Sequence, residues 1–389
     1  MELFWLEHKK LWRKKIVKIC VLLCFVYCVI FGSILSFQWF SFGSSDDYTS
    51  AFGNNFDGFT VIKDSQEYAL SFGGELTDET LQQIVSDYQQ MEADGMEKEL
   101  EKTDWQIVNS WLGTLYPELR DTSNYKTMIS YVDPDKLTGF YERRQQALDE
   151  FLEVSGQVGA EKEFLHQIER KVEKPFRYEW VEGWSTLLGS MVADLGVVMA
   201  LFLGIVLSSL FAGEWHDNTS TLVLTTRNGW GKIALAKILT GLAFTVELFA
   251  LLAVSNVISQ LFFMGTAGWD MPIQNIKLIA VAPMNMLQAE IYEYAFVLLG
   301  AIGFAGIVMF ISAAVKNNVL TLLLSLAVVY GPMMIAEYLP YGMQKALDLI
   351  PLVGSSTDIF RTNTFRILGK LIWSPYLLIT IPVSYTHLR

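Results

Sequence analysis

Long apolar runs separated by polar segments predict membrane-spanning helices in this chain. A helix of about 20 apolar residues crosses a hydrocarbon core of about 30 Å and satisfies its own backbone hydrogen bonds there. Runs of this kind cover residues 19–42, 184–211, 235–264, 295–315 and 319–336, and a sixth begins at Leu371. We therefore expect an α-helical polytopic membrane protein with six transmembrane helices, the last five of them in residues 184–389.

A polar segment at 43–183 separates the first two runs and predicts a domain of its own. It holds 29 acidic and 13 basic residues, whereas the rest of the chain has a net charge of +4. Its acidic residues form either a solvated surface or a face that binds cations. The pattern of apolar residues predicts a β-hairpin of 59–63 with 67–72, followed by helices at 77–91, 104–119, 136–154 and 161–172. Because the first run has no cleavage site after it, we expect a large, mainly helical extracellular domain between helices one and two.

Residues 1–18 predict an amphipathic helix that lies on the inner surface of the membrane. Trp5 and Trp12 belong to its apolar stripe, and Lys9 and Arg13 belong to its basic face. Tryptophan combined with Lys and Arg at this spacing suits the lipid headgroup layer. Six basic residues before the first span place the N-terminus in the cytoplasm. The alternative is a basic flank that only sets the orientation of the first span.

The polar segment 212–234, between the second and third runs, predicts a cytoplasmic elbow that contains a short helix at 217–228. Thr219 is one of three neighbouring candidates for the N-cap of this helix. Leu222 and Val223 give the helix a small apolar face. A short capped helix on the inner surface of a membrane protein is suited to docking into a groove of a partner.

The same stretch resembles the type-2 ABC exporter permeases, the ABC-2 family. The resemblance rests on the order F-A-G-E-W at 211–215, a Thr- and Ser-rich turn with T-L, then T-T-R and an apolar entry with A-K. It implies that the short helix is the coupling helix that contacts a separate ATPase subunit. It also implies a second permease copy or a paralogue, with ATP and Mg²⁺ bound by the ATPase. The residues implied in coupling are Glu214, Thr219, Leu222, Val223, Arg227 and Lys232.

Three of these coupling residues carry charge, and each has an ordinary alternative. Glu214 is placed to orient the coupling helix through the amides at its N-terminus. Arg227 and Lys232 are placed to pair with carboxylates of the ATPase or with lipid phosphates. The alternative for all three is a charge that only marks the membrane interface.

Motifs for catalysis by the chain itself are absent. The sequence contains no G-x-x-x-x-G-K-[ST], so ATP used for transport must be bound by another polypeptide. It also contains no G-x-S-x-G, H-E-x-x-H or C-x-x-C, so we predict neither a catalytic nor a metal site. No basic face accompanies the acidic domain, which argues against nucleic-acid binding. Cys20, Cys24 and Cys28 share one helix face, which favours packing over a metal or redox role.

Two acidic residues interrupt the apolar runs, Asp194 in the second and Glu247 in the third. An ionisable group at membrane depth costs a few kcal/mol, so it indicates function by default. Counting 1.5 Å per residue from the ends of the runs places both acids about 10–12 Å below the outer surface. We expect them to face a shared polar cavity, such as a substrate path. The alternative is that each acid is protonated and hydrogen-bonded between helices, or wetted from outside.

The resemblance, together with these patterns, implies the membrane-spanning permease subunit of an ABC exporter in the bacterial plasma membrane. Its expected substrate is an amphiphile, such as an antimicrobial peptide, a drug or a lipid. A second hypothesis is a non-transporting sensor or assembly protein whose extracellular domain binds a ligand or partner. The segment 384–389 resembles a sequencing-adaptor remnant, which predicts that the last helix is truncated and that the native chain continues.

Overall fold

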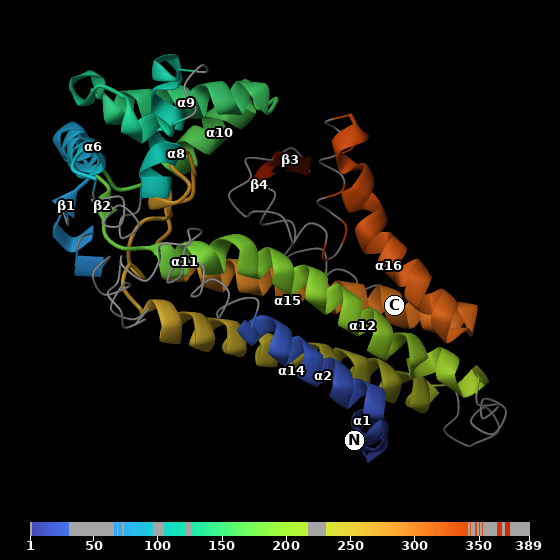
Figure 1. The fold of residues 1–389 in the computed structure, drawn as a ribbon. Helices are drawn as coiled ribbons and strands as arrows, with labels where there is room; N and C mark the ends of the chain where they lie inside the picture. The colour runs from blue at the N-terminus through green and yellow to red at the C-terminus, as the bar shows by residue number, and fades with distance from the viewer. Residues whose placement is uncertain are drawn as a thin grey trace, which may run out of the picture.

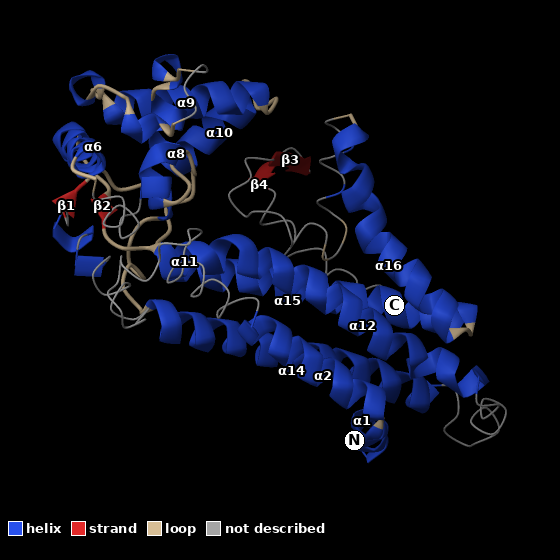
Figure 2. Cartoon of the chain, viewed as in Figure 1, coloured by secondary structure: helices blue, strands red, loops and turns tan. Residues whose placement is uncertain are grey.

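The structure, a computed structural model, is mainly helical (Figure 2). It describes residues 2–30, 66–67, 69–71, 74–95, 105–121, 126–216, 231–340, 343, 347, 350, 352, 364–367 and 370–373. Within these residues, four helical segments are long and apolar enough to cross a membrane, at Glu182–Trp215, Gly231–Met264, Met286–Val315 and Asn318–Ile335. The prediction of helices at these four apolar runs is therefore confirmed, and by length and composition each of them could cross a membrane.

The four segments form a bundle with the N-terminal helices (Figure 1). The first segment consists of α11 (Glu182–Thr186), a π-helical turn (Leu187–Met191) and α12 (Val192–His216). The others are α14 (Gly231–Met264), α15 (Met286–Val315) and α16 (Asn318–Ile335). In Figure 1, α12, α14 and α15 run side by side, and α16 starts against one end of α12 and α15 and diverges from them at an angle.

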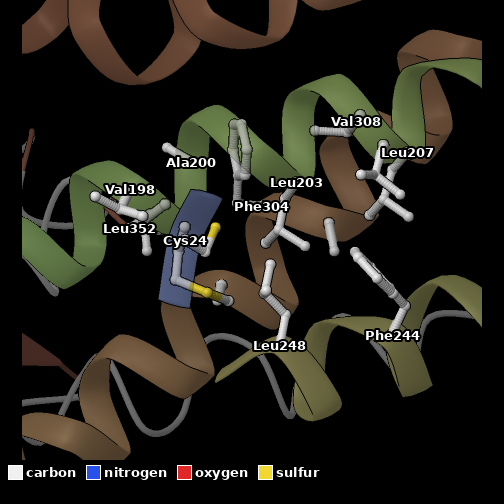
Figure 3. Packing of buried hydrophobic residues seen from close by; sticks show 14 of the residues in the cluster. Cys24, Val198, Ala200, Leu203, Leu207, Phe244, Leu248, Phe304, Val308 and Leu352 are labelled. Carbon is white, nitrogen blue, oxygen red and sulfur yellow. The ribbon is translucent and has the colours of Figure 1, made fainter. Parts of the chain in front are cut away.

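The interior of the bundle is a continuous apolar core (Figure 3). Figure 3 shows Leu203 of α12, Leu248 of α14 and Phe304 of α15 packed around Cys24. All three cysteines are buried, unpaired members of this core, which confirms their packing role.

The N-terminal helix is shorter than predicted. Helix α1 covers Glu2–Arg13, and α2 begins at Lys15 and ends at Tyr27. Lys14 between them has extended backbone angles, and its Nζ donates to Ser209 Oγ of α12 at 2.9 Å. The prediction of one helix over 1–18 was therefore wrong, because α1 packs against α14 while α2 turns to run along the bundle. The first predicted span is described only as far as residue 30.

The segment between α2 and α11 contains a helical domain that sits over one end of the bundle (Figure 1). Its helices are α6 (Asp78–Ala93), α8 (Trp105–Leu115), α9 (Phe140–Val154) and α10 (Ala160–Glu169). Strand β1 (Gly74–Glu75) pairs with β2 (Arg177–Tyr178) and closes the domain. Its core contains Leu81, Val85, Trp111, Leu112 and Phe140.

In this domain one local sequence prediction, the helix cap at Thr77, was confirmed, and another, the strand at 67–72, was wrong. The predicted cap Thr77 accepts a hydrogen bond from the Thr80 amide at 3.3 Å, as an N-cap should. The predicted strand at 67–72 is instead helical in the residues that are described there, 67 and 69–71. Its expected partner strand, 59–63, lies outside the described residues.

Two predicted boundaries in the membrane region were also wrong. The connection expected at 265–294 ends at Asn285, because Asn285 and Gln288 form a capping box that starts α15. The sixth apolar run does not begin as a helix at Leu371. Residues Lys370–Trp373 form β4, which pairs antiparallel with β3, Thr364–Ile367. The remainder of that run, and the suspected adaptor residues 384–389, lie outside the described residues.

Candidate functional site

Helices α12 and α14 are tied together at the ends that flank residues 217–230, which we call the elbow end. Lys237 of α14 is 2% exposed, and its Nζ donates to Glu214 Oε1 of α12 at 2.6 Å. The same Nζ donates to the Leu210 carbonyl at 2.7 Å. Lys10 of α1 lies 3.8 Å from Glu214 Oε1. Three helices therefore meet at one carboxylate, three residues before the segment 217–230 begins.

Helix α15 is attached to the same place by polar contacts. Ser312 Oγ donates to the Ser208 carbonyl at 2.6 Å and accepts from the Ala212 amide at 3.0 Å. Lys316, which follows α15, places its Nζ 4.0 Å from the centre of the Trp215 ring. The elbow end of α12 is thus held on two sides, by α14 and by α15.

Most of the residues predicted to couple the chain to an ATPase cannot be placed. Thr219, Leu222, Val223 and Arg227 lie outside the described residues. Lys232 is exposed in the first turn of α14. The docking role of the elbow helix therefore stays a prediction, whereas the attachment of Glu214 is a feature of the structure.

Glu247 belongs to the contact between α1 and α14. Its carboxylate accepts from Trp12 Nε1 at 3.0 Å and lies 3.2 Å from His8 Nε2. Trp12 also packs edge-on against Phe244, with ring centres 5.7 Å apart. Trp12 therefore contacts protein. Trp5 is 61% exposed, so its side chain is accessible for contact with lipid.

The basic face predicted for the N-terminal helix is exposed. Lys9 and Arg13 are both on the surface of α1. Their position is compatible with the headgroup layer, and the interfacial role of this helix stays a prediction.

Asp194 lies far from Glu247 along the bundle. Because Lys237 of α14 and Glu214 of α12 contact each other, they lie at the same level along the bundle. Distances along the two helices can therefore be counted from these two residues. Asp194 is 20 residues from Glu214, or about 30 Å, whereas Glu247 is 10 residues from Lys237, or about 15 Å. Asp194 is hydrogen-bonded to Tyr27 of α2. The prediction that both acids share one layer was wrong.

A buried polar cluster that was not predicted from the sequence lies between α14 and α15. Asn256 and Gln260 are one turn apart on α14, and Glu290 and Tyr294 are one turn apart on α15; we call these four residues the polar cluster. Asn256, Gln260 and Glu290 are 2%, 0% and 3% exposed. The Tyr294 hydroxyl is adjacent to the side chains of Asn256 and Glu290. By helix counting, Asn256 rather than Glu247 is the residue of α14 that lies at the level of Asp194.

Tyr294 interacts with the side chains of Glu290 and Asn256, but several polar atoms of this cluster form no short, well-aligned hydrogen bond to another described residue. They are both carboxylate oxygens of Glu290, both amide atoms of Gln260, Oδ1 of Asn256 and the hydroxyl of Tyr294. Glu290 forms no ion pair with any described residue. A buried, unpartnered polar group costs about 1–3 kcal/mol, and a charged one costs more. A cluster of them between two helices that could span a membrane is therefore a candidate functional feature.

Two sequence signals pointed to the polar cluster. Asn285 and Gln288 have the spacing of a capping box, which would have placed the start of α15 before Glu290. Asn256 with Gln260, and Glu290 with Tyr294, have the four-residue spacing of one helix face. Neither signal says that the two faces meet, because that depends on how the helices are rotated against each other.

The helical domain is joined to the connection 265–285 by buried polar contacts. Arg144 of α9 is 0% exposed; its Nη1 contacts Glu169 Oε1 at 2.6 Å, and its Nε donates to the Leu278 carbonyl at 2.7 Å. Trp111 Nε1 donates to the Asn275 carbonyl at 2.9 Å. One apolar cluster runs from α9 and α10 through this connection to the first turns of α15. The domain and the bundle are therefore packed together and are not joined by a flexible linker.

The buried carboxylate of Glu169 is kept ionised by its neighbours. Burial alone would raise the pKa of Glu169, but hydrogen bonds and charge from Lys174 and Arg144 outweigh it and lower the pKa. Lys174 Nζ lies 2.8 Å from Glu169 Oε1. The ion pair therefore depends on pH at the acid end of the range.

Acid should loosen this junction, and Glu169→Gln should remove part of that sensitivity. A carboxylate with a lowered folded-state pKa stabilises the fold above its unfolded pKa of about 4.3, and that contribution is lost as the pH falls through the folded value. We expect the wild type to be more stable than Glu169→Gln at pH 7 and the difference to shrink below pH ~4. Thermal unfolding of the full chain in detergent across pH 3–7 measures this; a constant difference would contradict it.

A pocket of about 320 Å³ opens beside this junction. Lys171, Phe176 and Arg177 line it from the helical domain, and Gln274 and Gln288 line it from the opposite side. Gln274 donates to the carbonyls of two residues of the connection, and its Oε1 has no hydrogen-bond partner. The pocket is thus a polar recess where the domain meets the bundle.

Comparison with protein-family models, with curated proteins and with solved structures finds no match to this chain.

Proposed function

We propose that this chain is the membrane-spanning permease subunit of an ABC exporter in a bacterial plasma membrane, energised by a separate ATPase subunit. The observation that carries the proposal is the Lys237–Glu214 ion pair at the elbow end. It joins the two helices that flank residues 217–230. A movement of the elbow caused by the ATPase would therefore be transmitted to both helices together. In this arrangement the N-terminus is cytoplasmic, and the first and sixth apolar runs complete six spans.

The polar cluster supports transport over simple anchoring. An anchor needs one apolar helix and gains nothing from a carboxylate buried between two such helices. A transporter needs polar groups at membrane depth, because its substrate must exchange interactions with water for interactions with protein. The expected cargo is an amphiphile such as an antimicrobial peptide, a drug or a lipid, and a second permease copy or a paralogue completes the assembly.

The second candidate function is a non-transporting sensor or assembly protein. It is favoured by the polar pocket between the helical domain and the connection 265–285. A ligand in this pocket would contact both the domain and the bundle and so alter how they pack. Under this hypothesis the chain has no need of an ATPase.

Substitution of the two apolar residues of the elbow helix should abolish binding of an ATPase. We expect an ATPase to co-purify with the tagged wild-type chain from native membranes, and to be lost from Leu222→Asp/Val223→Asp. The reason is that two carboxylates would have to be desolvated in the docking groove. Mass spectrometry of the purified complex, together with ATP hydrolysis by it, measures the result.

A matched control is Val158→Asp, which places the same charge on the helical domain at a residue that is 61% exposed. This variant should keep the ATPase. If both variants keep it, the exporter proposal stands and the docking site lies elsewhere. If no ATPase accompanies the wild type, the sensor hypothesis replaces the exporter.

A further inference from the structure

Helix α1 packs one side against the bundle and leaves the other side open. Leu11 is buried, and the Trp12 ring packs against Phe244 of α14. Much of the apolar stripe that the sequence assigns to lipid is therefore used for contact with protein. A partner that approaches α1 from outside must bind its open side.

The open side of α1 combines cations with apolar side chains. Trp5, Lys9 and Arg13 follow one another at intervals of four residues and form one ridge of the helix, with Leu6 beside it. All four side chains are exposed, and we call them the outer face of α1. Glu2 is the one acidic residue among the exposed residues of α1. Neither Lys9 nor Arg13 forms an ion pair with any described residue, so the outer face carries uncompensated positive charge.

The same pattern continues past the break at Lys14. Lys15 and Lys18, in the first turn of α2, are exposed and form no ion pair within the described part of the chain. Ile16 and Ile19, which lie between and beside them, are exposed as well. Uncompensated cations alternate here with exposed apolar side chains, which is the composition of helices that bind the headgroup layer of a membrane.

Helix α1 lies across the end of the bundle, at the level where headgroups are expected. It leaves the line of α2 at a steep angle (Figure 1). Lys10 lies 3.8 Å from Glu214 at the elbow end, whereas His8 Nε2 lies 3.2 Å from Glu247, about 15 Å farther along α14. The two contacts place α1 between these levels. Trp5 packs edge-on against the His8 ring, with ring centres 6.1 Å apart, and so lies on the side away from the elbow.

An apolar surface begins beside the outer face. Leu22 and Leu23 of α2 and Leu239 and Val246 of α14 are all exposed on helices of strongly apolar composition. Surfaces of this kind suit the acyl chains of lipids. The outer face of α1 is therefore at the boundary between an apolar belt and water, where phosphate groups of a bilayer lie.

We propose that the outer face of α1, continued by Lys15 and Lys18, binds anionic phospholipids and that the bound lipids stabilise the elbow end. Lys9 and Arg13 pair with the lipid phosphates, while Trp5 contacts the upper part of the acyl chains. A zwitterionic headgroup brings its own cation, so basic residues add affinity mainly for lipids with net negative charge. Cations that only orient the first span would need neither a fixed helix nor exposed apolar neighbours.

The link from the lipid to the elbow end consists of two printed contacts of this region. Lys10 of α1 contacts Glu214 of α12, and Lys14 Nζ donates to Ser209 Oγ of α12 at 2.9 Å. A lipid that holds α1 in place therefore also stabilises its contacts with α12. The proposal requires no ATPase and stands whether or not the chain exports a substrate.

The test is thermal unfolding of the purified full chain in a neutral detergent, titrated with phosphatidylglycerol or with phosphatidylcholine of the same acyl chains. A ligand that binds only the folded state raises stability in a saturable way. We expect phosphatidylglycerol to raise the apparent Tm by about 3–6 °C and phosphatidylcholine to raise it by less than about 1 °C. Hydrogen exchange of α1 should slow in the same titration.

Paired variants locate the effect. Lys9→Gln/Arg13→Gln should raise the midpoint of the phosphatidylglycerol response about tenfold, because two phosphate contacts are lost. Trp5→Ser/Leu6→Ser keeps both charges and should also raise the midpoint, because apolar contact is lost. The matched control, Lys136→Gln/Arg170→Gln, removes two charges from the helical domain at side chains that are 64% and 66% exposed, and it should keep the full response.

Three outcomes would overturn the proposal. Equal stabilisation by the two lipids would mean that the cations only set the orientation of the first span. A full response in the variant with all four cations changed to Gln would place the lipid elsewhere. An equal response to glycerol phosphate, which has the anionic headgroup without acyl chains, would mean that the face binds a free anion and not a lipid.

Discussion

Arg144→Leu should lower the apparent Tm of the full chain by about 5–10 °C. Arg144 is fully buried, and it bonds Glu169, the Leu278 carbonyl and the Ala280 carbonyl. Its removal leaves a buried carboxylate with Lys174 as partner and the Leu278 carbonyl without its donor, whereas the Ala280 carbonyl keeps Gln274. Breaking a buried pair in this way costs about 3–5 kcal/mol. Thermal unfolding in detergent measures the loss, and limited proteolysis shows whether the helical domain separates from the bundle.

Most of the stability lost in Arg144→Leu should come from the buried Glu169 carboxylate that loses its arginine, rather than from the lost packing contacts of Arg144. Arg144→Leu combined with Glu169→Leu should recover part of the stability, because two apolar side chains replace the pair without leaving a charge behind. Arg170→Leu is the matched control. Arg170 pairs with Glu163 on the surface, with side chains 66% and 53% exposed, and such pairs contribute little. A double variant less stable than Arg144→Leu alone would contradict this account.

Lys237→Met should destabilise the elbow end by about 2–4 kcal/mol. Its Nζ is held by Glu214 and the Leu210 carbonyl, and it lies 5.3 Å from the centre of the Phe211 ring. Methionine fills the same volume without a charge, so Glu214 would lose its short ion pair at 2.6 Å and keep the longer contact to Lys10 at 3.8 Å. The measurement is thermal unfolding of the full chain in detergent, together with hydrogen exchange at the adjoining ends of α12 and α14.

A rescue experiment and a control make this result specific. Lys237→Met combined with Glu214→Gln should be more stable than Lys237→Met alone, since the carboxylate that loses its short ion pair is then neutral. Lys18→Met, which changes an exposed lysine of α2 in the same way, should leave stability within about 0.5 kcal/mol of the wild type. Equal effects at Lys237 and Lys18 would mean that the elbow end is not held by this pair.

The presence of the helices was predictable from the sequence, whereas the pairs of polar side chains that contact each other were not. The long apolar runs and the cap at Thr77 are local signals, and the structure has helices at those places. From the sequence, Lys237 is expected to be an exposed cytoplasmic charge next to the elbow, yet its side chain is buried, at 2% exposed. Its burial depends on Glu214, which is 23 residues away and on another helix.

The pairing of polar residues inside the bundle shows the same limit. Counting residues from the ends of apolar runs placed Asp194 and Glu247 together, because the third run was assumed to begin at the membrane surface. Counted from the Lys237–Glu214 contact, Asp194 lies 20 residues along α12 and Glu247 only 10 residues along α14, so the two helices could not be aligned by assuming one membrane thickness. The same error in where α15 starts left Glu290 in a loop.

The sequence by itself determined that the chain is helical, that at least four of its segments suit a membrane, and that an acidic domain interrupts them. These properties follow from the periodicity and length of apolar runs, which depend only on near neighbours. Tertiary structure alone decided which charges are buried and which polar side chains meet. Those outcomes depend on the rotation and register of packed helices, set by contacts between residues far apart in the chain.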